Sequence, residues 1–205
     1  MNGSNRQHRR SRTNEIINAT LREKRTRERL FAFEQELFRE PRRYLVLFLT
    51  LNYRSEYHED ITLRTIQRHR DTFLKRIEEA RDGVLSEIQA CIWKLEEGSS
   101  AGLHLHCLIF FSGRHCADTY YAEQIGEYWV TSVTRGWGEY WNSNTKRQKA
   151  SYEQKYGNCL GQVNTGDEQK RESLRRFISA YFAKQTQVPA GRGPHDRTWG
   201  ARSYD

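Results

Sequence analysis

The chain has 205 residues, a formal net charge of +8 at pH 7 and 12% aromatic residues. The length favours one domain with a sizeable core, and the lack of an apolar run of membrane length excludes a membrane-spanning protein and predicts a soluble, cytoplasmic one. The basic excess predicts a polyanionic partner, above all nucleic acid, and the aromatic rings can stack on unpaired bases.

The first forty residues predict a basic arm followed by a helix. Residues 1–13 are polar and rich in arginine, which is typical of a disordered arm that contacts phosphates. Residues 14–39 carry an imperfect apolar stripe with helical spacing, with Asn14 as a possible cap. Pro41 is expected to end this helix.

A nearly continuous apolar run follows at residues 44–53. Its length and β-forming composition predict a central strand that is buried on both faces. Thr50 and Asn52 are its first polar side chains and share a face, so they either contact a substrate or mark an ordinary strand end. Residues 60–82 then show helical periodicity, with Asp60 as a plausible cap.

Two apolar runs around a Gly/Ser-rich turn predict a β-hairpin with strands at 84–96 and 103–111. Side chains two positions apart in a strand share a face, so His104 and His106 point the same way. By the same alternation Glu96 projects onto that face, and the hairpin can bring it beside the two histidines.

Two imidazoles and one carboxylate suit Mg²⁺ or Mn²⁺ acting on a phosphate. Glu97 is the alternative third ligand, but it should point toward the core or sit in the turn, so Glu96 is preferred. The competing interpretation is that the two histidines are ordinary polar residues on a solvated strand face. A structural zinc is disfavoured because Cys107 points away from His104 and His106. No two of the four cysteines form a C-x-x-C pair, so we expect a reducing compartment without disulfides.

The second half of the chain predicts two helices, a long loop, a short strand and an extended tail. In order these are helix 118–133, loop 138–156, strand 159–164, helix 167–185 and tail 186–205. The loop is polar and aromatic, and its Lys146 and Arg147 lie either in solvent or along a nucleic-acid strand. The whole order predicts an α+β fold with a central antiparallel sheet of about four to five strands, helices packed on it and an added N-terminal helix.

Tyr181 and Lys184 lie near the end of the last predicted helix. Tyr181 belongs to the stripe that faces the sheet, where a tyrosine is more often packing than chemistry. Opposite a strand that holds a metal, the phenol becomes a candidate nucleophile for a phosphate. Lys184, one turn later, can stabilise developing negative charge.

Three motifs, in this order, resemble those of the HUH single-strand endonucleases, a family named for two histidines around a hydrophobic residue. They are Phe48-Leu49-Thr50-Leu51-Asn52, then Glu96-Glu97-Gly98 with His104-Leu105-His106, and finally Tyr181-Phe182-Ala183-Lys184, which matches the family's Y-x-x-K motif. The segment 93–106 is most similar to that of the replication initiators of filamentous phages and related prophage proteins. The resemblance implies an HUH/RRM-like endonuclease domain over 41–188, between the basic arm and helix at 1–40 and a basic tail at 189–205.

The resemblance also implies an activity: a metal-dependent endonuclease and strand transferase that initiates rolling-circle replication in a bacterial or phage-infected cell. Tyr181 would attack single-stranded DNA, leaving a 5′-phosphotyrosine and a free 3′-OH. Glu96, His104 and His106 would hold Mg²⁺ or Mn²⁺. The implied partners are single-stranded DNA at a replication origin and, because the chain lacks a P-loop, a host helicase. Several phage initiators carry two catalytic tyrosines, whereas here only Tyr181 fits the final helix.

Two alternatives stay open. Gln185, four residues after Tyr181, resembles a residue of single-tyrosine HUH transposases that can join the metal; DNA hairpins beside the gene would favour that class. A non-catalytic nucleic-acid-binding protein would carry His104 and His106 on its surface and would show no metal-dependent nicking.

Overall fold

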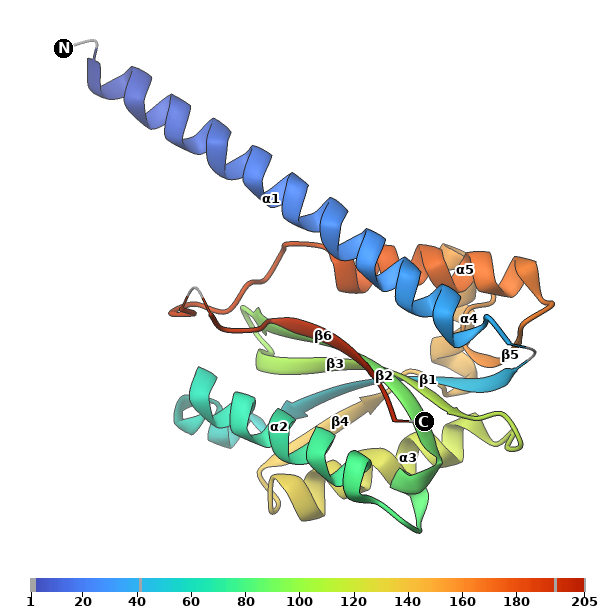
Figure 1. Ribbon diagram of the computed structural model, residues 1–205. Helices are drawn as coiled ribbons and strands as arrows, with labels where there is room; N and C mark the ends of the chain where they lie inside the picture. The colour runs from blue at the N-terminus through green and yellow to red at the C-terminus, as the bar shows by residue number, and fades with distance from the viewer. Residues whose placement is uncertain (1–2, 41, 194, 205) are drawn as a thin grey trace.

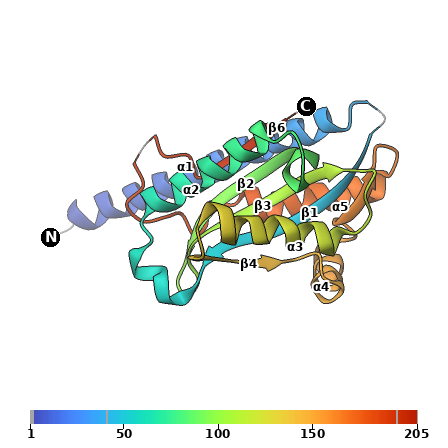
Figure 2. The same cartoon turned by 90° about the horizontal axis from the view of Figure 1, so that it is seen from below.

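One antiparallel sheet separates two layers of helices (Figures 1 and 2). The computed structural model describes residues 3–40, 42–193 and 195–204, with side chains from residue 16 onward. The strands are β1 (Arg43–Tyr53), β2 (Ile88–Gly98), β3 (Gly102–Ser112), β4 (Gly138–Asn142), β5 (Gly161–Asn164) and β6 (Trp199–Ser203). The helices are α1 (Gly3–Leu37), α2 (Leu63–Glu79), α3 (Asp118–Tyr128), α4 (Lys146–Tyr156) and α5 (Glu168–Ile178). The predicted α+β class is confirmed.

Short helical segments join or extend these elements. Two are 3₁₀ turns, η1 (Ser55–Asp60) and η2 (Val84–Glu87). The other two are π-helical turns that continue α3 and α5, namely η3 (Trp129–Val133) and η4 (Ser179–Ala183). Single π-helical turns inside α-helices are frequent at functional sites, and η4 contains Tyr181.

The strand order is β4-β1-β3-β2-β6, and β5 pairs with the part of β1 that β4 leaves free. The central strands β1, β3 and β2 are buried at most of their positions, as expected for a sheet covered on both faces. Residues 44–49 of β1 are each fully buried, so the predicted central strand is confirmed.

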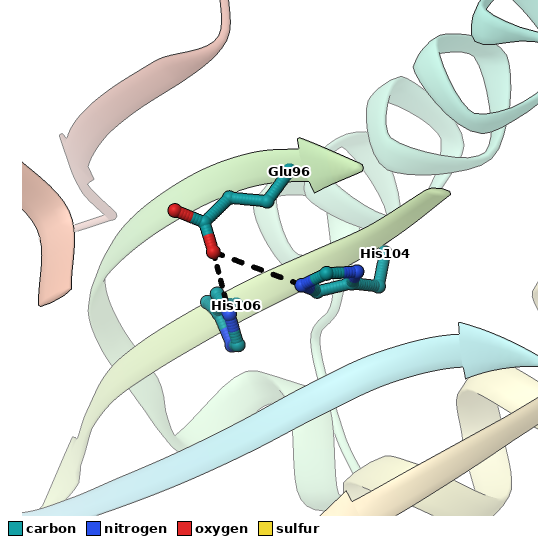
Figure 3. Close-up of side chains that lie close together, drawn as sticks. All are labelled: Glu96, His104 and His106. Carbon is teal, nitrogen blue, oxygen red and sulfur yellow. Dashed lines mark hydrogen bonds and ion pairs between the residues drawn. The ribbon is translucent and has the colours of Figure 1, made fainter. Parts of the chain in front are cut away.

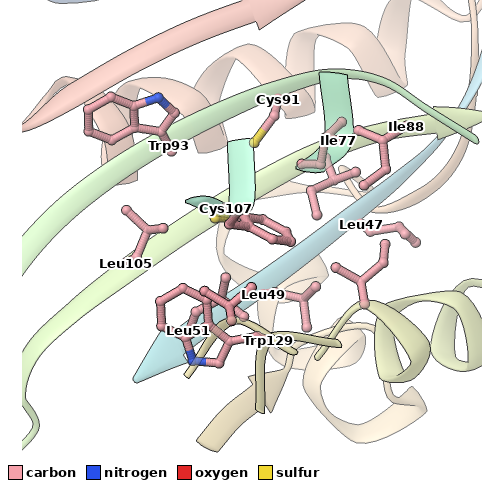
Figure 4. Packing of buried hydrophobic residues seen from close by; sticks show 14 of the residues in the cluster. Leu47, Leu49, Leu51, Ile77, Ile88, Cys91, Trp93, Leu105, Cys107 and Trp129 are labelled. Carbon is pink, nitrogen blue, oxygen red and sulfur yellow. The ribbon is translucent and has the colours of Figure 1, made fainter. Parts of the chain in front are cut away.

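The face of the sheet toward α2 and α3 carries one hydrophobic core. Leu47, Leu49 and Cys107 point into it from β1 and β3, and Trp129 closes it from η3 (Figure 4). The apolar residues of α2 recur at helical spacing, so they form one stripe, and this predicted stripe packs against the core.

The opposite face packs against α1, α4 and α5, and Figure 1 shows α1 and α5 on the other side of the sheet from α2 and α3. Phe48 of β1 meets Phe177 of α5 with ring centroids 4.9 Å apart. Glu34 of α1 is fully buried and accepts hydrogen bonds from Arg171 (2.8 Å) and Arg175 (2.9 Å). A buried carboxylate needs such partners, so this cluster ties α1 to α5 and fixes the helix that carries Tyr181.

Two predictions at the start of the chain are wrong. The expected disordered arm at 1–13 is helical from Gly3, because no glycine or proline after that residue interrupts the helix. The second helix begins after Thr62, whose hydroxyl accepts from the Thr65 N–H; Asp60 belongs instead to η1. Met1, Asn2 and Pro41 lie outside the described residues.

Two further predictions are wrong in the second half. The predicted loop at 138–156 contains β4 and α4, because α4 packs on α5 through Tyr152 and Tyr156 rather than through a continuous apolar stripe. The predicted extended tail contains β6, which pairs antiparallel with β2. Backbone pairing across more than a hundred residues leaves little trace in composition.

All four cysteines are free, and Cys116 is the exposed one. Within the described residues, no helix has both the length and the apolar character needed to cross a lipid bilayer.

Candidate metal centre and nucleophile

The β2–β3 hairpin sets the candidate site. Its register places Glu96 opposite His104 and Lys94 opposite His106. Since directly paired residues share a face, all four side chains project to the α5 side of the sheet. Figure 3 shows Glu96, His104 and His106 pointing toward one another. The structure therefore brings together the carboxylate and the two imidazoles that strand alternation predicts.

The three candidate ligands have the spacing that one ion requires. Oε2 of Glu96 lies 3.1 Å from Nε2 of His106 and 3.7 Å from Nε2 of His104. One ligand atom from each of the three residues lies within 4.8 Å of the other two. Two atoms bound at about 2.1 Å to one octahedral ion lie about 3 Å apart, so small side-chain shifts suffice to bind it.

Each imidazole is oriented through its other nitrogen. His104 Nδ1 lies 3.0 Å from the Gly102 carbonyl, which can only accept, so Nδ1 donates to it and Nε2 faces Glu96. His106 Nδ1 lies 3.0 Å from the Thr50 hydroxyl. Such outer contacts hold metal-binding histidines in one ring orientation. The donor set and its orientation fit a divalent cation.

The protonation states also suit metal binding. Burial alone would raise the pKa of Glu96, but hydrogen bonds from His104, His106 and Lys94 outweigh it and hold that pKa well below its ordinary value. Burial lowers the pKa of His106, with the Glu96 hydrogen bond opposing. At pH 7 the carboxylate is therefore ionised and His106 is neutral, which are the forms that bind metals.

Glu97 lies elsewhere. Its carboxylate accepts from the Ala190 N–H at 2.6 Å, and its own N–H donates to the Gln187 carbonyl at 2.9 Å. Glu97 thus holds the segment after η4 against the hairpin, and Glu96 is the carboxylate at the two histidines.

Tyr181 lies beside the cluster. Its ring centroid is 5.8 Å from that of His106, at an interplanar angle of 83°. Phe48 and Phe177 pack on the same ring, with centroids at 5.3 Å and 4.8 Å. Burial, with the neighbouring Tyr152 hydroxyl, raises the pKa of Tyr181, so the phenol is protonated at neutral pH. A nearby cation would favour the phenolate.

The lysine that contacts the candidate site is Lys94, whereas the sequence predicted Lys184. The helix ends at Ala183, and Lys184 is exposed in extended backbone. Lys94 is instead 5% exposed, ion-pairs with Glu96 and donates from Nζ to the Tyr181 carbonyl at 3.0 Å. Lys94 thereby links the candidate metal ligand to the π-helical turn that bears the phenol. Sequence reasoning missed it, although it lies two residues from Glu96 on the same strand face.

The residues predicted to contact DNA have mixed surroundings. Thr50 supports His106, and Asn52 Nδ2 donates to Glu139 while its Oδ1 is buried without a partner among the described residues. Lys146 and Arg147 are exposed in the first turn of α4, on the same side of the sheet as the cluster.

Replacing Lys94 by methionine keeps the apolar stem and removes the ammonium. If the chain cleaves DNA as the motif resemblance implies, this change should slow cleavage by about 10–100-fold, the usual range for residues that orient metal ligands. The Mn²⁺ affinity should not fall, because a positive charge beside the ion has been removed. Single-turnover cleavage and Mn²⁺ titration measure the two effects.

Lys170→Met is the matched control for Lys94→Met, since Lys170 Nζ also donates to a carbonyl, that of Gln162, away from the cluster. Equal cleavage rates for Lys94→Met and the parent protein would show that Lys94 does not position the site.

A scan against protein-family models found no match for the chain, and a search of the curated proteins found none either.

Proposed function

We propose that this protein is a metal-dependent single-stranded DNA endonuclease and strand transferase that initiates rolling-circle replication through a 5′-phosphotyrosine. The observation that supports this most is the position of Tyr181, whose ring contacts His106 of the Glu96–His104–His106 cluster. The motif order resembling HUH endonucleases and the basic charge of the chain support it further.

Mg²⁺ or Mn²⁺, when bound by Glu96, His104 and His106, would polarise the scissile phosphate. The remaining chemistry belongs to the chain. The Tyr181 oxygen attacks phosphorus and loses its proton, a P–O(Tyr) bond forms, and the P–O3′ bond breaks. The departing 3′ oxygen gains a proton, so the products are a phosphotyrosine and a 3′-OH. Attack by a 3′-OH on the phosphotyrosine reverses the step and joins DNA without ATP.

The surrounding side chains prepare this step. Phe48 and Phe177 fix the plane of the Tyr181 ring, and Lys94 fixes its backbone. Thr50 and the Gly102 carbonyl keep the histidine Nε2 atoms turned toward Glu96. Holding reacting groups in place before the substrate arrives is a main source of rate enhancement. Lys184 stays a predicted contributor of positive charge and is exposed directly after η4.

The proposed partners are single-stranded DNA at a replication origin and a host helicase. The test is incubation with single-stranded oligonucleotides from the protein's own replicon, with Mn²⁺ or with EDTA. A protein–DNA band that survives denaturation in Mn²⁺ only, with release of a fragment ending in 3′-OH, is the expected result. Absence of the band with every origin segment would refute the proposal and favour a non-catalytic nucleic-acid-binding protein.

A further inference from the structure

A positively charged groove lies between α1 and the segment that leads into β6. Its volume is about 540 Å³. Three arginines reach it from one face of α1, Arg22, Arg25 and Arg29, and two from the C-terminal segment, Arg192 and Arg197. Figure 1 shows that this segment passes below α1 after leaving η4 and then returns as β6.

The charge of this groove is largely unbalanced. The five arginines are exposed, and none forms a salt bridge with a described residue. Asp196 is the acidic residue in the lining, and its carboxylate already accepts from the Gly193 N–H and from Gln67. Like charges gathered from two distant segments repel one another, and a bound polyanion relieves that repulsion.

Aromatic rings accompany the charges. Trp199 of β6 lines the groove with one face of its ring near the Arg29 guanidinium, whose carbon lies 5.1 Å from the ring centroid. Phe33 of α1 lines it as well. Arginines interleaved with aromatic rings are the usual equipment for binding unpaired nucleotides, because the cations hold phosphates and the rings stack on bases.

The groove and the candidate metal centre lie on the same face of the sheet. Trp199 pairs with Lys94, Lys94 with His106, His106 with Thr50, and Thr50 with Trp141, so the five residues form one row on one face of the sheet. Trp199 is two strands from His106, about 10 Å at ordinary strand spacing.

Trp141 lies at the opposite end of this row. Its side chain is 54% exposed on β4, next to the basic first turn of α4. A DNA strand that runs along this row would therefore meet an aromatic ring on each side of the metal cluster.

We propose that this groove binds the backbone and bases of single-stranded DNA on one side of the cleaved phosphate and guides the strand along the Trp199–Trp141 row to Tyr181. The choice of single-stranded DNA as the ligand rests on the proposed function. The groove itself rests on its own charges and rings, so the two can fail separately.

The test measures binding of a fluorescent oligothymidylate of about 20 nucleotides to the full chain. Arg25→Gln combined with Arg29→Gln should weaken binding about tenfold and flatten the plot of log affinity against log salt by about 1.4, since each phosphate contact on a single strand contributes about 0.7. Arg64→Gln with Arg68→Gln is the control, because both arginines are exposed on α2 at the other face and the charge change is identical.

Trp199→Leu tests the stacking contribution. It keeps an apolar side chain in β6 and should weaken binding about tenfold, within the range found for one base on one aromatic ring. It should also reduce the quenching of tryptophan fluorescence by the oligonucleotide. Thermal melts of this variant identify any loss of folding, and the arginine pair variant, which keeps the Trp199 ring in place, gives a second result.

The outcomes separate the groove from the nuclease. Equal losses in the α1 and α2 arginine variants, equally tight binding of duplex DNA, or equal competition by polyglutamate would each overturn the groove. Loss of binding in the groove variants of a protein that never nicks DNA would support the groove while refuting the proposed function. If the protein nicks DNA but its groove variants bind DNA normally, the groove is refuted and the proposed function is supported.

Discussion

Tyr181→Phe is expected to abolish the covalent protein–DNA adduct, by at least about a thousandfold, while single-stranded DNA binding stays within about twofold of the parent protein. Phenylalanine preserves the ring contacts with Phe48, Phe177 and His106 and removes only the oxygen that forms the bond to phosphorus. Denaturing gels measure the adduct, and fluorescence anisotropy measures binding.

Tyr152→Phe is the matched control for Tyr181→Phe. Tyr152 belongs to the same aromatic cluster, with its ring centroid 5.9 Å from that of Tyr181. It should still form the adduct, because its ring belongs to α4 and, among the described residues, no ring contact joins it to His104 or His106. Loss of the Tyr152 hydroxyl removes one cause of the raised pKa of Tyr181, so it should not slow the attack. Full adduct yield from Tyr181→Phe, or its loss only in Tyr152→Phe, would show that Tyr181 is not the nucleophile.

The site residues were easier to predict from the sequence than the helices and strands around them. Strand alternation has a period of two and leaves little freedom, so His104, His106 and Glu96 could be assigned to one face before the register was known. The same rule would have given Lys94, which was read only as part of the strand. The helix end was harder to predict, because the helix closes with a π-helical turn and ends at Ala183, which leaves Lys184 outside it.

The elements that sequence reasoning missed depend on long-range contacts. β6 has one glycine, one arginine and one serine in five residues, so it is stabilised by its pairing with β2 rather than by its own composition. α4 has little amphipathic pattern and is held by Tyr152 and Tyr156 against α5. These contacts place Trp199 beside Lys94 and build the groove, so the groove could not be predicted from the sequence.

Metal binding is expected to have a large effect on both stability and cleavage. Mn²⁺ at about a hundred times its dissociation constant should stabilise the folded protein by about 2.7 kcal/mol, which raises the melting temperature of a chain of this size by about 5–10 °C. His104→Ala should remove this shift and metal-dependent cleavage together, because two remaining ligands leave the ion too weakly held. Glu96→Gln should do the same, since the amide has no charge to attract the ion and Lys94 loses its partner.

His115→Ala is the control for the metal variants. His115 also lies beside a carboxylate, with Nε2 3.3 Å from Glu87, but no second histidine completes a cluster there among the described residues. Its Mn²⁺ shift and cleavage should match those of the parent protein. An undiminished Mn²⁺ shift in both His104→Ala and Glu96→Gln would place the ion elsewhere. The contact between Tyr181 and His106 would then be packing alone, and a phenol of raised pKa without a cation beside it has no means of attacking a phosphate at neutral pH.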